Sequence, residues 1–405
     1  MIDFEASRVE ALLDEGVRDL VHKALFIRLA MLKREAVGSS RAAALQPVFD
    51  LIGQFPAVEV CQLATPFFWF NALRCEGLAE GAAGDVAVAG LAVTAADSLL
   101  PFSPPGTRLR LGLPARAEGY AFPRIGRRFQ LCEEAELVHQ GEGRIIVTGA
   151  GAEAEGAPIV LPIPGHDGVD LLLSNDPVLF HDDYRFKIVA DTGKAQELAS
   201  LIGQALDLIQ TLSPGLAARM NGLVQWYVPI GSDDFKVHNS FTASTLLGVI
   251  FLSDAYSSLR LAEAMVHEYH HNQLFSLMAG ETLFEDVDGA IYYSPWREDP
   301  RPLTGLFHAL YVFANVWAFM RLAQARPEFS DMRPEIEAEC DRLRWQLEIG
   351  LRQIPRDRIL PAGEAILGDV EQVARLAAIA DAPDRVIQHM RGWRNRNPGL
   401  ALHGA

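Results

Sequence analysis

Five consecutive residues, His267-Glu268-Tyr269-His270-His271, read H-E-x-x-H and carry the clearest chemistry in the chain. His267 and His271 are four residues apart, so on a helix their side chains lie one above the other on the same face. Two imidazoles placed in this way can bind one metal ion, and the adjacent glutamate can serve as a base or support the ligands. The spacing therefore predicts a metal centre with these two histidines as ligands.

The segment 257–279 must form the helix that positions the two histidines, with Ser257 or Ser258 as its N-terminal cap. At about 100° per residue, the histidines share a stripe with Leu274 and Met278, and the opposite face is apolar as well. This pattern predicts a mostly buried helix. Because an unpaired buried polar group costs about 1–3 kcal/mol, the imidazoles need partners. A metal ion is one solution, and backbone carbonyls around a pair of core histidines are the other.

A catalytic metal normally has three protein ligands and open positions for water or substrate, so a third ligand must come from elsewhere. Glu281 and Glu285 follow closely, at a helical spacing of four. His308 lies further along, in the first turns of an apolar helix predicted at 303–325, where a charge would be costly. The spacing alone favours neither interpretation of His308, as a metal ligand or as a core histidine that is hydrogen-bonded to the protein.

An extended stretch, Tyr293–Pro302, separates the two predicted helices, and its prolines keep it out of a helix. It contains Arg297 and Arg301. Arginines are most often surface residues, but two of them beside a metal site can also hold a carboxylate through paired hydrogen bonds.

Three motifs together, HEYHH at 267–271, SPWREDPRP at 294–302 and GLFHALYVFA at 305–314, resemble the αKG-HExxH proteins, a family of HExxH motif-containing peptide modification proteins. The resemblance is strongest from about 240 to 325. It implies an oxygenase that depends on Fe(II) and 2-oxoglutarate. Such an enzyme hydroxylates the β-carbon of a residue in a ribosomally synthesised peptide, while 2-oxoglutarate is converted to succinate and CO₂.

Carried over to this chain, the resemblance implies three iron ligands: His267, His271 and His308. Glu268 would lie behind these ligands or be a weak ligand itself. Arg301, in preference to Arg297, would bind the distal carboxylate of 2-oxoglutarate. The familiar iron triad includes a carboxylate, so Glu268 or Asp299 is an alternative to one histidine. The implied partners are a precursor peptide and a radical-SAM maturase that acts on the same peptide.

A zinc metallopeptidase is the alternative enzyme. In that case Glu268 is the general base for a zinc-bound water, and Glu281, Glu285 or His308 is the third ligand. A strand predicted at 242–252 leads into the HExxH helix, as it also does in zinc peptidases, so the order of elements does not separate the two enzymes. A third hypothesis is a non-enzymatic subunit that binds partners in a peptide-maturation complex.

The expected fold class is α+β, mainly helical, with a β-rich middle region and a metal site between two buried helices. We expect an N-terminal helical region at 1–106, a β-rich region at 107–190 and a metal-binding catalytic region at 191–405 that forms one compact unit. His139 and His166 lie in the β-rich region, where we expect them to be solvated loop residues.

Composition narrows the class of partner. The net charge of −16 over 405 residues argues against nucleic acid or an anionic membrane. The first residues lack the pattern of a signal peptide, and the longest apolar runs, such as Leu310–Met320, are predicted to be too short to cross a bilayer. The widely spaced cysteines indicate reduced thiols in a cytoplasmic protein: Cys61, Cys75, Cys132 and Cys340.

Overall fold

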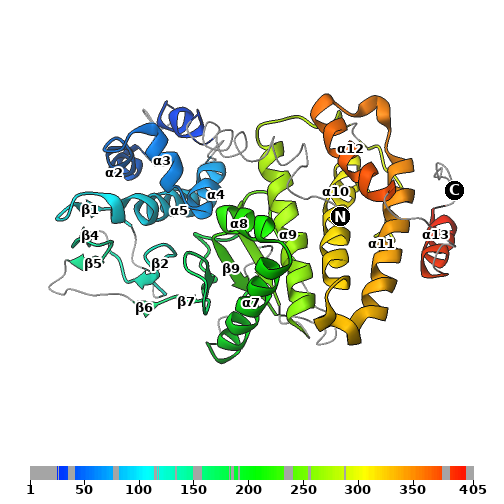
Figure 1. Ribbon diagram of the computed structural model, residues 1–405. Coiled ribbons are helices and arrows are strands. Elements are labelled where there is room, and N and C mark those ends of the chain that lie inside the picture. The colour runs from blue at the N-terminus through cyan, green and yellow to red at the C-terminus, as the bar shows by residue number, and fades with distance from the viewer. Residues whose placement is uncertain are drawn as a thin grey trace. The chain divides into compact units, whose positions relative to one another are not determined.

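The computed structural model describes residues 25, 27–34, 42–75, 82–113, 116, 118–132, 135–148, 157–181, 183, 187–189, 192–231, 240–253, 257–286, 289–375 and 384–397. Helices predominate among them, and the strands form three small sheets (Figure 1). The predicted α+β class, mainly helical with a β-rich middle region, is confirmed.

The chain divides into two compact units. The described residues of the first, which we call the site unit, lie within Gln204–Leu223 and Tyr256–Ala405. The second, the sheet unit, consists of Asp19–Gly203 and Val224–Ala255. Helix α7 (Thr192–Leu212) contains one of the points at which the chain passes between them, at Gly203–Gln204.

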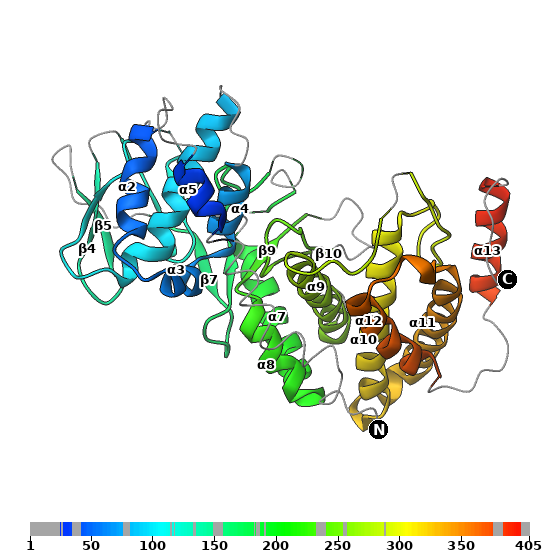
Figure 2. The same ribbon diagram turned by 90° about the horizontal axis from the view of Figure 1, so that it is seen from above.

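Helices build the site unit: α8 (Pro214–Leu223), α9 (Ser258–Met278), α10 (Leu303–Gln324), the 3-10 helix η3 (Pro327–Met332), α11 (Arg333–Gln353), the 3-10 helix η4 (Arg356–Arg358), α12 (Pro361–Arg375) and α13 (Asp384–Arg396). Helix α10 packs against α9, α11 and α12, and Figures 1 and 2 show α9, α10 and α11 side by side. A helix with neighbours on several sides must be apolar on several faces, which explains the sequence of α10.

Helix α9 begins where the sequence predicts. The hydroxyl oxygen of Ser257 accepts a hydrogen bond from the backbone N–H of Arg260 at 3.3 Å, as an N-terminal cap does. The helix ends at Met278, and the Gly280 N–H then bonds to the Leu277 carbonyl.

Two described helical segments are long and apolar enough to cross a bilayer, Asp85–Phe102 and Leu303–Gln324. The expectation that every apolar run is too short for this is therefore wrong. In both segments 72% of the apolar window is buried inside the protein, as in the core helices of soluble proteins.

The sheet unit combines helices with all the strands. Its helices are α2 (Ala42–Ile52), α3 (Ala57–Leu63), α4 (Pro66–Arg74), α5 (Ala82–Leu99) and the 3-10 helix η2 (Leu100–Phe102). Its strands are β1 (Arg108–Arg110), β2 (Tyr120–Phe122), β3 (Arg127–Phe129), β4 (Glu136–His139), β5 (Ile145–Thr148), β6 (Ala157–Pro158), β7 (Val160–Pro162), β8 (Asp170–Leu172), β9 (Trp226–Pro229), β10 (Ser240–Phe241) and β11 (Val249–Leu252).

Two of the sheets are antiparallel, in the orders β1-β4-β5 and β2-β3-β6. The third has the order β10-β11-β9-β8-β7, in which β11, β9 and β8 are parallel and both edge strands are antiparallel. Every residue of β9 and β11 is buried, as expected for parallel strands covered on both faces.

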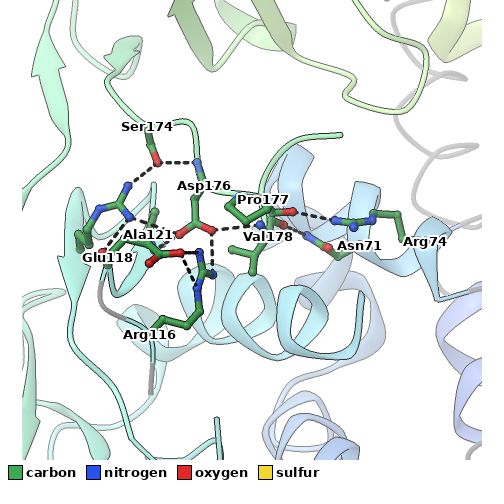
Figure 3. Close-up of polar contacts among 10 residues, drawn as sticks. Asn71, Arg74, Arg116, Glu118, Ala121, Ser174, Asp176, Pro177 and Val178 are labelled. Carbon is green, nitrogen blue, oxygen red and sulfur yellow. Dashed lines mark hydrogen bonds and ion pairs between the residues drawn. The ribbon is translucent and has the colours of Figure 1, made fainter. Parts of the chain in front are cut away.

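A buried carboxylate stabilises the sheet unit (Figure 3). Asp176 accepts hydrogen bonds from the Arg116 guanidinium at 3.0 Å and from the backbone N–H groups of Ala121 and Val178 at 3.0 and 3.1 Å. The Asn71 amide of α4 in turn donates to the Val178 carbonyl at 2.7 Å. All of the hydrogen bonds around Asp176 join parts of the sheet unit, so we assign the cluster a structural role.

Several local predictions need correction. The extended stretch that begins near Tyr293 pairs only through an isolated bridge between Tyr292 and Arg301 among the described residues. His139 is a buried residue of β4 whose Nδ1 lies 2.7 Å from the Ser103 carbonyl, and not a solvated loop residue. His166 is partly buried, with Nε2 3.2 Å from the Gly203 carbonyl. Three cysteines are free thiols: Cys75, Cys132 and Cys340. The side chain of the fourth, Cys61, lies outside the described residues.

Candidate metal centre

Helices α9 and α10 bring the three predicted histidines together. Nδ1 of His271 lies 3.2 Å from Nδ1 of His308, and the centroids of the two rings are 5.4 Å apart. The His267 ring follows on α9, with its centroid 4.9 Å from that of His271. The packing of α10 on α9 therefore brings His271 and His308 into contact, although they are 37 positions apart in the sequence.

The His271–His308 pair has the spacing of two ligands on one ion. With metal–nitrogen bonds of about 2.1 Å, neighbouring ligand nitrogens lie about 3.0–3.4 Å apart, and the measured 3.2 Å falls in this range. Across the described ranges, no group of three or more His, Cys, Asp or Glu side chains is already arranged to hold a metal ion. The donor chemistry therefore fits for the pair, and His267 must turn its ring to complete a set of three.

All three rings are neutral at physiological pH. Burial is the largest cause and lowers the pKa of His267 to about 3, that of His271 to about 4 and that of His308 to about 3. Neighbouring positive charge adds to the effect. A neutral imidazole is the form that binds metals, so few protons compete for these nitrogens.

Helix α9 is mostly buried, as predicted, and the histidine stripe is its less buried face. His267, His271, Phe275 and Met278 are partly exposed, whereas Leu274 is 1% exposed and packs into the core. Phe275 thus takes the place that the sequence analysis gave to Leu274. His308 on α10 is 5% exposed, so solvent reaches this face only through the partly exposed side chains of α9.

Aromatic rings surround the histidines. Phe275 lies 4.6 Å from the His308 ring and Phe313 lies 4.9 Å from the His267 ring, both measured between centroids. Trp296 stacks on Phe313 at 5.2 Å with an interplanar angle of 5°. None of these ring contacts is predicted by the sequence. Continuing the four-residue spacing from His271 finds Phe275, but no local signal brings Trp296 to α10.

Met278 fixes the tautomer of His308. Its sulfur lies 3.3 Å from Nε2 of His308, and a thioether can only accept a hydrogen bond. With the proton on Nε2, Nδ1 of His308 accepts the 3.2 Å hydrogen bond from Nδ1–H of His271, and a metal ion would displace that proton. The sulfur of Met278 accepts the hydrogen bond from Nε2. Hydrogen bonds of this kind orient metal-binding histidines in other proteins.

The two residues between the histidines are buried. Glu268 is 3% exposed, and at one position from His267 it lies about 100° around the helix from the ligand stripe. His270 is 5% exposed, and its Nδ1 lies 2.7 Å from the Val266 carbonyl. This contact within the helix does not favour a substrate-facing role for His270.

The two arginines differ in their partners. Burial is the main cause of the lowered pKa of His267 and His271, and the charge of Arg297 adds to it. This exposed side chain directly follows Trp296, whose ring stacks on Phe313 beside His267. Within the described part of the chain Arg297 forms no ion pair. Arg301, favoured by the sequence analysis, pairs instead with Asp299 at 3.1 Å. The geometry favours Arg297 as the cation available to an anionic ligand.

The alternative glutamate ligands lie on an exposed segment that is not helical. Glu281 and Glu285 are exposed, and Phe284 between them bridges to Ile359, so the predicted helical spacing of the two glutamates is wrong.

No protein-family model matches the chain, and no curated protein matches it. The functional conclusion therefore depends on the residues and geometry of the site.

Proposed function

We propose that the protein is an Fe(II)- and 2-oxoglutarate-dependent oxygenase that hydroxylates the β-carbon of a residue in a ribosomally synthesised peptide, in the cytoplasm. One juxtaposition supports this function above all. The neutral His271 and His308 rings have their Nδ1 atoms 3.2 Å apart, and the pKa of His271 is lowered mainly by burial and in part by the charge of Arg297, an exposed cation that forms no ion pair among the described residues.

The residues have distinct roles in this proposal. His267, His271 and His308 would hold Fe(II) and leave open positions for the co-substrate. Bound Fe(II) would supply the oxidation of 2-oxoglutarate by O₂, which gives succinate, CO₂ and the hydroxylated carbon. The Arg297 guanidinium would bind the distal carboxylate of 2-oxoglutarate through paired hydrogen bonds. The aromatic side chains around the rings would keep water away from the reacting carbon.

The test compares two arginines in one protein. We expect Arg297→Ala to weaken 2-oxoglutarate binding about 10- to 100-fold, since a hydrogen-bonded charge contributes about 1.5–3 kcal/mol. The matched control Arg301→Ala should change it little. Binding is measured anaerobically on Fe(II)-loaded protein, and succinate formation is measured in air with the cognate peptide.

Two results would contradict the oxygenase. One is iron-loaded wild-type protein that does not bind 2-oxoglutarate, and the other is equal binding by wild type and Arg297→Ala. The zinc metallopeptidase makes the opposite prediction. It would lose peptide cleavage in Glu268→Gln and keep it in Arg297→Ala.

A further inference from the structure

Helix α13 packs on the segment that carries Arg297. Tyr293 of that segment joins a buried apolar cluster with Val386 and Trp393 of α13 and Ile349 of α11. The Tyr293 and Trp393 rings meet edge to face, with centroids 4.7 Å apart. This contact attaches α13 to the segment four residues before Arg297.

His389 of α13 bonds to the same segment at two points. Its Nδ1 lies 3.0 Å from the Tyr293 hydroxyl. Its ring also hydrogen-bonds to the backbone of Arg297, and because that bond favours the protonated ring, the backbone group is the carbonyl oxygen. A neutral imidazole satisfies both partners, with one nitrogen accepting from the hydroxyl and the other donating to the carbonyl.

A third polar contact lies one residue further on. Arg396 near the end of α13 is 3.7 Å from the Glu298 carboxylate, and both side chains are well exposed. Such a pair contributes little to stability, but it lies directly after Arg297. Contacts from α13 therefore reach residues 293, 297 and 298.

The guanidinium of Arg297 forms no ion pair among the described residues, so the backbone of this segment sets the point from which the side chain reaches a ligand. We infer that His389 is a positioning residue, which holds the Arg297 backbone where the side chain can reach a carboxylate bound at the histidine pair. This inference rests on the proposed function, because it gives the carboxylate-binding arginine a support from a separate helix.

The test removes the hydrogen bonds of His389 and leaves the apolar cluster around Tyr293 and Trp393 intact. His389→Ala removes both hydrogen bonds, whereas His389→Gln retains an acceptor and a donor. Gln388→Ala is the matched control, since Gln388 is an exposed neighbour on the same helix. We expect His389→Ala to raise the KM for 2-oxoglutarate about tenfold, as the loss of one or two hydrogen bonds implies, with kcat and Fe(II) affinity unchanged. His389→Gln should recover most of the loss.

Hydrogen exchange gives a readout that does not require activity. The backbone amides of residues 294–298 should exchange about tenfold faster in His389→Ala and at the wild-type rate in Gln388→Ala. Tyr293→Phe removes the hydroxyl and keeps the ring, so it tests the bridge if His389→Ala does not fold. Unchanged exchange in the variants that fold would overturn the inference. Wild-type protein that fails to bind 2-oxoglutarate would instead overturn the proposed function, with the exchange result still deciding the role of His389.

Discussion

Replacing Gly90 by alanine tests the packing of α5 against α4. A Cβ atom on Gly90 would lie 2.1 Å from Oδ1 of Asn71 and 2.7 Å from its Cγ, which is far inside van der Waals contact. Asn71 is completely buried, and its Nδ2 donates to the carbonyls of Phe67 at 2.9 Å and Val178 at 2.7 Å. The amide cannot move aside without breaking at least one of these hydrogen bonds.

The expected cost follows from three opposing contributions. Alanine in place of glycine inside a helix stabilises by about 1 kcal/mol. Overpacking a core costs about 2 kcal/mol, and breaking one buried hydrogen bond costs about 2 kcal/mol more. Gly90→Ala should therefore lower the free energy of unfolding by about 3 kcal/mol.

Urea unfolding of four proteins measures this value: wild type, Gly90→Ala, Asn71→Ala and the double variant. Asn71→Ala removes the atoms that the new Cβ would meet. In that background Gly90→Ala should be neutral or stabilising, because only the gain in helix propensity remains. An equal loss of stability in both backgrounds would refute the reasoning, and so would a Gly90→Ala protein as stable as wild type.

Three further predictions concern the site and the pH dependence of stability. A Cβ on Gly350 would lie 2.9 Å from Cη2 of Trp296, so Gly350→Ala should displace that ring, lower stability by about 1 kcal/mol and weaken Fe(II) binding, both measurable by titration. Met278→Leu should weaken Fe(II) binding about tenfold, since His308 loses its hydrogen-bond acceptor, and unchanged affinity would count against the assigned tautomer. Burial raises the pKa of Asp97 from 3.8 to about 7, so the folded protein holds this proton more tightly than the unfolded chain. Its contribution to stability is complete below about pH 4 and is lost as the pH rises to about 7, and Asp97→Asn should flatten that part of a stability profile.

The sequence predicted the long helices well because their signals are local. Helix α10 begins at the start of the predicted range 303–325 and ends one residue before its end, and α9 starts at its predicted serine cap. Residues whose environment depends on distant segments were predicted poorly. The burial of His139, for example, depends on the Ser103 carbonyl 36 residues earlier, and nothing in the surrounding sequence indicates that contact.

The candidate site shows the same limit. The spacing of His267 and His271 placed them on one helical stripe, but only the packing of α10 on α9 brings His308 within 3.2 Å of His271. The two arginines cannot be ranked by spacing, because the ranking depends on which of them Asp299 neutralises. The motif therefore predicts the donor types, and tertiary structure determines which of them meet.

The five-stranded sheet has a consequence for how the protein is made. Its neighbouring parallel strands β8 and β9 are separated in the chain by α7 and α8. A ribosome that has released only the first two hundred residues has therefore produced β8 without the partner that covers one of its edges. Until residues 226–252 emerge, that edge is open to pairing with other chains. Expression clones that stop near residue 203 should accumulate in inclusion bodies, whereas clones that continue past residue 255 include every strand of the sheet.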